Sequence, residues 1–215
     1  MKNVNFYYVR HGETLFNSIH RVQGWCDSPL TAKGISDAEK ARDALKDISF
    51  RFCYCSTSER CRDTAAIVLK GRDTETVFSK KLKEFNFGLM EGEYAADHQE
   101  ELNYRQRVTI DFSDIGGDTL ETESRRIREI HKEIIDRSND GDNVLIVSHG
   151  AVWMHMLGYL FSIDRNDYFQ KAISLGAAHP VPNGLVCRFH HDGCRFVMDE
   201  LYDRDPSFLK SLKRI

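Results

Sequence analysis

The stretch Asn5-Phe6-Tyr7-Tyr8-Val9-Arg10-His11-Gly12 passes directly from an apolar run into charged and small residues. Residues 5–9 have the length and apolar character of a buried strand, so Arg10-His11-Gly12 begins the loop that follows it. The arrangement recurs where the apolar run 143–147 is followed by Ser148-His149-Gly150. A third apolar run, 50–55, ends at Ser56, and Arg60 follows about one helical turn later. If these strands are parallel, they deliver two histidines and two arginines to one edge of a sheet, where ligands bind in such folds.

Helical patterns separate these apolar runs, and this alternation is typical of a mainly parallel sheet covered by helices. A helix is predicted after Thr31, another after residues 50–55, and a largely apolar one over 151–161. Asp118 and Glu121 fit a capping box, in which an N-cap acid and a Glu three residues later satisfy free amides reciprocally. The first of these helices has Ile35, Ala38, Ala41 and Leu45 near helical spacing, and the second runs through Ala65, Ala66 and Leu69. The helix after the capping box places Ile127, Ile130, His131 and Ile134 on one face.

Two segments depart from this alternation. Residues 185–189 and 195–198 flank His190-His191-Asp192-Gly193, and the Asp-Gly pair predicts a hairpin turn between two strands. The polar stretch from Glu93 to Gly117 resembles an insertion that covers a site. We therefore predict an α/β three-layer sandwich with a mostly parallel central sheet and helices on both faces, forming one domain over residues 1–215 with a lid at about 93–117.

Composition excludes several classes of function. The chain has 215 residues, of which 41% are apolar, and a net charge of −3 that gives no basic surface for nucleic acid. No stretch approaches the roughly 20 apolar residues of a membrane span, and the N-terminal apolar run is too short for a signal peptide. The six cysteines include no CxxC pair, which argues against a metal site and favours reduced thiols. We expect a cytoplasmic protein that contacts neither nucleic acid nor membrane; its oligomeric state is not readable from the sequence.

The four residues at the predicted sheet edge suit phosphate chemistry. Arginine offers planar, permanently charged forks to phosphate oxygens, and a neutral histidine can accept a phosphoryl group. The glycine after each histidine should let a ligand approach the backbone and leave an amide free to donate. The departing alkoxide then needs a proton. Glu84 lies between aromatic residues that would raise its pKa, although a solvated surface acid is an equally consistent interpretation of its context.

Five motifs follow one another along nearly the whole chain. They are Tyr8-Val9-Arg10-His11-Gly12-Glu13-Thr14, Gln23-Gly24 with Asp27-Ser28-Pro29-Leu30-Thr31 and Gly34, Arg60-Cys61-Arg62-Asp63-Thr64-Ala65, Leu82-Lys83-Glu84 with Gly88 and Glu91-Gly92, and Val147-Ser148-His149-Gly150. Their order resembles that of the histidine phosphatase superfamily, which includes the phosphoglycerate mutases. Two departures are visible: Cys61 replaces a small apolar residue, and Glu59 precedes Arg60.

The resemblance implies that His11 becomes phosphorylated and that Glu84 is the proton donor. It implies no metal and no cofactor, and a small phosphorylated metabolite as substrate. Arg60 is preferred to Arg62 because its spacing to Thr64-Ala65 fits the family. The residues that the resemblance places around the phosphate are Arg10, Arg60 and His149, with Asn17, Gln23, Gly24 and Gly150 as secondary substrate contacts.

Several alternatives stay open at this point. Segment 84–88, Glu-Phe-Asn-Phe-Gly, resembles the phosphatase branch and favours hydrolysis, but mutase-type phosphoryl transfer is the main alternative. A non-catalytic phospholigand-binding module is a weaker one. A metal-dependent hydrolase is disfavoured because the arginines would repel a cation. The sequence does not identify the physiological phosphomonoester, and it does not show whether the tail 208–215 closes over the site. The insertion residues that could contact a leaving group are Tyr94, His98, Tyr104, Arg105 and Arg107.

Overall fold

The computed structural model describes residues 2–177 and 179–215, without the side chains of 106 and 107. Its centre is a six-stranded sheet with the order β3-β2-β4-β1-β5-β6. The first four strands in this order are parallel, whereas β5 and β6 are antiparallel to their neighbours. The strands are β1 (Val4–Arg10), β2 (Phe52–Ser56), β3 (Glu75–Ser79), β4 (Asn143–Ser148), β5 (Val186–His191) and β6 (Phe196–Leu201).

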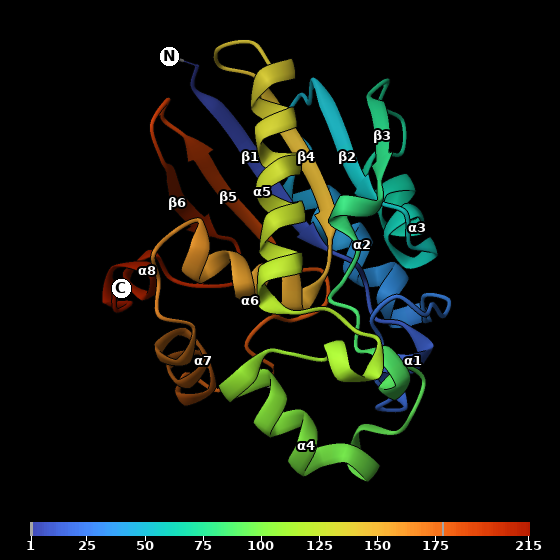
Figure 1. Ribbon diagram of the computed structural model, residues 1–215. Helices are drawn as coiled ribbons and strands as arrows, with labels where there is room; N and C mark the ends of the chain where they lie inside the picture. The colour runs from blue at the N-terminus through green and yellow to red at the C-terminus, as the bar shows by residue number, and fades with distance from the viewer. Residues whose placement is uncertain (1, 178) are drawn as a thin grey trace.

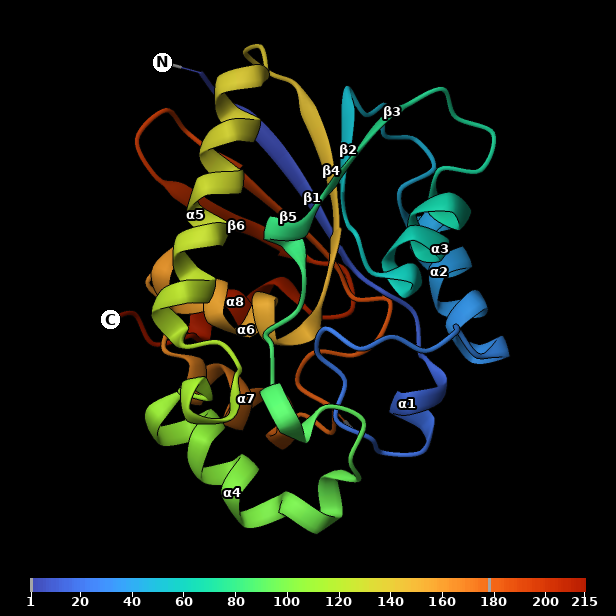
Figure 2. The same cartoon turned by 45° about the vertical axis from the view of Figure 1, so that its right-hand side comes forward.

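Helices cover both faces of the sheet, which gives the predicted three layers (Figures 1 and 2). One face carries α5 (Leu120–Arg137), α6 (Gly150–Tyr159), α7 (Arg165–Ser174) and α8 (Pro206–Ser211), and the other carries α2 (Ala32–Ala44) and α3 (Glu59–Val68). Alternate residues of each strand enter opposite cores, as the pleat requires. In β1, for example, Phe6 and Tyr8 pack with α5 and α6, while Tyr7 and Val9 pack with α2 and α3.

The predicted fold class is confirmed, and so are the hairpin of β5 and β6 and the buried face of α5. Edge strand β3 was not predicted; each of its residues is exposed or only half-buried, so no apolar run marks it. The predicted capping box of α5 is wrong by one residue, because Thr119 is the N-cap and Thr122 is its partner. Ile35, expected in the buried face of α2, is 45% exposed, and Asp37 is buried in its place.

Residues 93–117 lie beyond the carboxyl ends of the parallel strands, where Figure 2 shows α4 (Gln99–Tyr104) below the sheet. Leu102, Ile110 and Phe112 form an apolar cluster with Phe85 and Phe87, which follow Glu84 in the chain. The aromatic residues around Glu84 thus anchor this segment over one end of the sheet. The remaining short helices are α1 (Leu15–Ser18), η1 (Lys80–Leu82), η2 (Gly88–Met90), η3 (Ala95–His98), η4 (Arg105–Thr109) and η5 (Ser113–Ile115).

None of the helices in the described part of the chain combines the length and apolar character that crossing a membrane requires.

Candidate active site

The carboxyl ends of β1 and β4 place two histidines side by side. β1 and β4 pair in parallel, with Arg10 opposite Ser148, so His11 and His149 leave the sheet at the same level. Their ring centroids are 5.3 Å apart, and the side chains are almost completely buried, with 2% and 0% exposed. The structure therefore brings together the two histidines that the sequence places 138 positions apart.

Hydrogen bonds fix the form of the His11 ring. Its Nδ1 lies 2.8 Å from the carbonyl oxygen of Gly12, which can only accept, so Nδ1 carries the proton. Its Nε2 accepts from Nε of Arg60 at 3.2 Å and therefore carries the lone pair. Burial, together with the charges of Arg60 and Arg10, holds the pKa of His11 well below its usual range. His11 is thus a neutral imidazole with a nucleophilic Nε2.

Arg60 joins the two histidines and has no exposed surface. Its Nη2 donates to Nδ1 of His149 at 3.0 Å and to the carbonyl of Gly24 at 2.8 Å. Its Nη1 forms an ion pair with Asp27 at 2.9 Å. Arg62, in contrast, is exposed and stacks over the ring of Phe78. The structure therefore places Arg60, and not Arg62, in the site.

His149 is held from several directions. The Tyr8 hydroxyl donates to the carbonyl of His149 at 2.6 Å and accepts from its backbone N–H at 3.0 Å. Because Nδ1 accepts from Arg60, Nε2 carries the proton and faces the hydroxyl of Ser56 at 2.8 Å. Cys61, noted as a departure from the family pattern, lies 3.5 Å from Nε2, and burial raises the pKa of its thiol, so it adds no charge.

Arg10 retains an unused donor. Its Nη1 donates to the carbonyl of Val181, whereas its buried Nε has no hydrogen-bond partner among residues 2–177 and 179–215. A side chain at Gly150 would place its Cβ 3.1 Å from this guanidinium, so the glycine makes room for it. A buried donor without a partner costs free energy, which an anionic ligand would recover.

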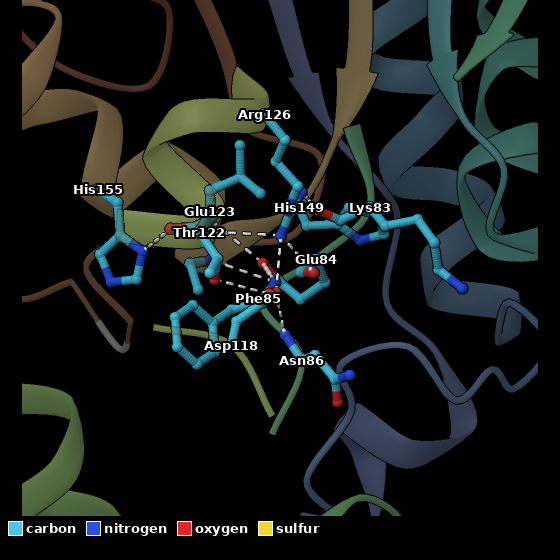
Figure 3. A network of polar contacts seen from close by, with 12 residues as sticks. Lys83, Glu84, Phe85, Asn86, Asp118, Thr122, Glu123, Arg126, His149 and His155 are labelled. Atoms are coloured by element: carbon cyan, nitrogen blue, oxygen red, sulfur yellow. Dashed lines mark hydrogen bonds and ion pairs between the residues drawn. The ribbon is translucent and has the colours of Figure 1, made fainter. Parts of the chain in front are cut away.

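Glu84 is buried beside the first residues of α6, with 6% of its surface exposed. The interpretation of Glu84 as a solvated surface acid is therefore wrong. Its Oε1 accepts from the backbone amides of Phe85 at 3.0 Å and Val152 at 3.1 Å, and its Oε2 from that of Ala151 at 3.2 Å (Figure 3). Burial and the charge of Glu123 raise its pKa, against the opposing effect of Arg60. Oε2 accepts one amide where Oε1 accepts two, so Oε2 is the oxygen with room for the proton.

The predicted role of the glycine after His11 is wrong. A Cβ at Gly12 would lie 2.1 Å from the carbonyl oxygen of Gly34, so the missing side chain admits the start of α2 and not a ligand. The Gly12 amide is not free either, because it donates to Thr64 at 3.1 Å. Thr64 lies one helical turn after Arg60 and donates to its carbonyl at 2.8 Å, so it ties the loop to α3.

The predicted secondary contacts lie near the site but already have protein partners. Asn17 caps α1 and accepts from Asn183 at 3.1 Å, and Gln23 bridges Thr14 and Ser28. Gly24 supplies a carbonyl to Arg60, as described above. Of these residues, Asn17 lines one cavity beside Arg10, and Gln23 and Gly150 line another.

Two cavities meet at Arg10, with volumes of about 1180 and 780 Å³. The smaller contains Glu84 in its wall, and its lining combines aromatic residues around Phe85 with charged residues that include Arg10, Arg21 and Arg165. The predicted contact residues Tyr94, His98, Tyr104 and Arg105 line neither cavity, and the Arg107 side chain lies outside the described residues. The insertion instead contributes Ala95, Gln99, Leu102, Asn103, Ile110 and Phe112 to the smaller cavity.

Sequence reasoning missed the partners that orient the site. Asp27 and Thr64 both lie within segments that carry the family resemblance, so the motifs contained a signal for them. Tyr8 and Ser56 both contact His149, which lies far from them in the sequence. Only the pairing of β1 and β2 with β4 brings these residues together. The pair of Glu123 and His155 had no sequence signal.

Known proteins share this fold and sequence pattern. A probable phosphoglycerate mutase, GpmB of Escherichia coli O139:H28, is 33% identical over 148 residues, which are 67% of this chain and 68% of the relative. The crystal structure of phosphoglycerate mutase from Bacillus anthracis superposes with a TM-score of 0.79 at 28% identity and covers 97% of this chain and 96% of its own. The α-ribazole phosphatase of Shigella flexneri superposes with a TM-score of 0.74 at 25% identity, covering 92% and 95%. Relatives thus include mutases and phosphatases.

The family model of the histidine phosphatase superfamily, branch 1, matches residues 6–204, a span that contains His11, Arg60, Glu84 and His149, and the chain therefore belongs to this superfamily.

Proposed function

We propose that the protein is a phosphatase that hydrolyses small phosphate monoesters through a phosphohistidine intermediate on His11. The observation that carries the proposal is the state of the His11 ring, a buried neutral imidazole with its proton fixed on Nδ1 and its lone pair on Nε2. Arg10 offers an unpartnered Nε, and Arg60 and His149 lie beside His11, where a bound phosphate would take over part of their present hydrogen bonds. Glu84 supplies a carboxyl with a raised pKa on the leaving-group side.

In the first step, Nε2 of His11 forms a bond to phosphorus while the bond from phosphorus to the ester oxygen breaks. Arg60 must turn its Nε donor from His11 to a phosphate oxygen, because Nε2 can attack only with its lone pair free. Glu84 gives its proton to the departing oxygen, so the product leaves as an alcohol. The charges of Arg10 and Arg60 stabilise the negative phosphoryl oxygens as the transition state forms.

In the second step, a water molecule attacks the phosphorus of the phosphohistidine. Glu84, now a carboxylate, accepts a proton from that water, and the bond between Nε2 and phosphorus breaks. Orthophosphate leaves, and both His11 and Glu84 return to their starting states. No metal or organic cofactor takes part in this scheme.

The smaller cavity supports hydrolysis of monoesters with a sizeable leaving group. Its 780 Å³ and the aromatic residues Phe85, Phe87 and Phe112 suit an alcohol larger than glycerate with a flat or apolar part. Residues 93–117 form the outer wall of this cavity, and we assign them the role of a lid over the leaving group.

Phosphoglycerate mutase activity is the second candidate, because relatives that include the E. coli protein described above carry that name. The deciding experiment is a panel of phosphomonoesters assayed for released orthophosphate, run beside an assay for interconversion of phosphoglycerates. The proposal predicts release that is abolished in His11→Ala. If interconversion of phosphoglycerates greatly exceeds phosphate release, the protein is a mutase and the proposed phosphatase activity is wrong.

A further inference from the structure

A second buried carboxylate lies next to the Glu84 segment. Glu123, on α5, has no exposed surface, and its Oε2 pairs with Nδ1 of His155 on α6. Its Oε1 has no hydrogen-bond partner in the described part of the chain, and Nη2 of Arg126 is 3.9 Å away. Burying a carboxylate with one oxygen unsatisfied is unfavourable, because neither water nor a protein donor compensates that oxygen. Glu123 is therefore not explained by a contribution to the stability of the fold.

Two connections tie Glu123 to Glu84 (Figure 3). The same nitrogen of Arg126 that approaches Glu123 donates to the backbone carbonyl of Glu84 at 2.9 Å. His155 also lies one helical turn after Ala151, whose amide binds the Glu84 carboxyl, and Glu84, Ala151 and His155 line the same cavity. Glu123 thus lies close enough to the Glu84 segment for its charge to act on the Glu84 carboxyl.

The direct contacts of Glu84 oppose the role of an acid. Three backbone amides donate to its carboxyl group, and Arg60 and Arg10 act on it with positive charge. Each of these favours the carboxylate, which cannot donate a proton. Burial and the negative charge of Glu123 act in the other direction. The nearby carboxylate of Glu123 is therefore a specific side chain that counters these contacts.

We propose that Glu123, oriented by His155, is a positioning residue that keeps Glu84 in its protonated form; this inference rests on the proposed role of Glu84 as proton donor. It concerns only which protonation state Glu84 adopts before the leaving group departs. The other titratable or charged groups that act on Glu84 or Glu123 are Tyr8 and Arg10 on β1, Arg60 and Cys61 on α3, Arg126 on α5, Tyr159 on α6 and Arg165 on α7.

The test is Glu123→Gln, which retains the shape and an oxygen to pair with His155 but removes the charge. The alkaline limb of kcat/KM for an alkyl phosphate should move to lower pH by about one unit, since one unit corresponds to a tenfold change in protonation equilibrium. Glu121→Gln removes the same charge from an exposed position of α5 and should leave the limb in place. An unmoved limb in Glu123→Gln overturns the proposal.

A double variant separates this role from a structural one. In Glu84→Gln the acid is already absent, so adding Glu123→Gln should leave the remaining rate and its pH dependence unchanged. If Glu123→Gln instead lowers the rate equally in both backgrounds, Glu123 supports the structure only and the proposal fails.

A titration that needs no turnover separates the inference from the proposed function. With ¹³C-labelled glutamate carboxyl carbons, the Glu84 resonance is the one missing from Glu84→Gln. Its midpoint should fall by about one pH unit in Glu123→Gln, again the change expected on losing a nearby like charge. This holds even if the panel of phosphomonoesters shows no hydrolysis, which would overturn the proposed function alone. An unchanged midpoint would overturn the role of Glu123.

Discussion

Replacing Glu84 with Gln should lower kcat/KM, and the loss should be larger for substrates whose leaving group needs a proton. An alkyl alcohol leaves poorly as an alkoxide, whereas nitrophenolate leaves readily without protonation. General acid catalysis typically contributes about 10² to 10⁴ in rate. We therefore expect kcat/KM to fall by about that factor on a sugar or glycerol phosphate, and far less on p-nitrophenyl phosphate.

The structure also sets the cost of the substitution to folding. Of the two carboxyl oxygens, Oε1 accepts two amides and Oε2 only that of Ala151, so the least costly Gln rotamer places its NH₂ at Oε2. The Ala151 amide then faces a donor, and one unsatisfied buried group costs about 1–3 kcal/mol. This loss of stability lowers the folded fraction for both substrates alike, so it cannot produce a difference between them.

The assay is the ratio of kcat/KM on the two substrates, measured at one pH for the wild type and each variant. Glu91→Gln is the matched control, because Glu91 is a neighbouring carboxylate that accepts from the amides of Trp25, Cys26 and Phe87. It should lower stability and leave the substrate ratio unchanged. Equal losses on both substrates in Glu84→Gln would refute its role as proton donor, and a shifted ratio in Glu91→Gln would transfer that role to Glu91.

Further predictions concern the phosphate site and acid stability. Arg60→Lys keeps a charge but loses the planar guanidinium that joins both histidines, so kcat/KM should fall by at least about a hundredfold. Arg62 is exposed, so Arg62→Ala should keep a kcat/KM near that of the wild type. The reverse pattern would show that the wrong arginine was assigned to the site. Tyr8→Phe removes both hydrogen bonds to the His149 backbone and should lower the free energy of unfolding by about 1–3 kcal/mol together with kcat, which urea denaturation and steady-state kinetics would check. Burial lowers the pKa of His131 to about 4 from 6.5, so between these pH values the unfolded chain binds a proton that the folded chain does not. The free energy of unfolding should therefore fall by up to about 3 kcal/mol as pH drops from about 6.5 to about 4. In His131→Leu, urea denaturation at several pH values should no longer show this contribution to the pH dependence of stability.

Much of the site could be predicted because its main groups lie next to strand ends. Arg10, His11 and His149 follow apolar runs, and the parallel arrangement of those runs carries them to one edge of the sheet. The role of Gly12 could not be read locally, because its cause is the carbonyl of Gly34 on another element. A glycine next to a catalytic residue has the same sequence signal whether a ligand or the protein itself occupies the space.

The missed features depend on contacts between distant segments. Strand β3 is an edge strand with exposed positions, so its sequence lacks the continuous apolar run of a central strand. Glu123 and His155 are charged or titratable residues of amphipathic and apolar helices, and their pairing follows from the packing of α5 against α6. The start of α5 shifted by one residue because Asp118 and Thr119 are both good N-caps, and the structure uses the threonine.

In the proposed mechanism the phosphoryl group passes through His11. The most direct measurement is a brief incubation with a ³²P-labelled phosphomonoester, an alkaline quench and mapping of the labelled peptide. We expect a label that is stable to alkali, labile to acid, located on the peptide containing His11 and absent from His11→Ala. A label that persists in His11→Ala, or steady turnover of the wild type with label on another residue, would contradict it.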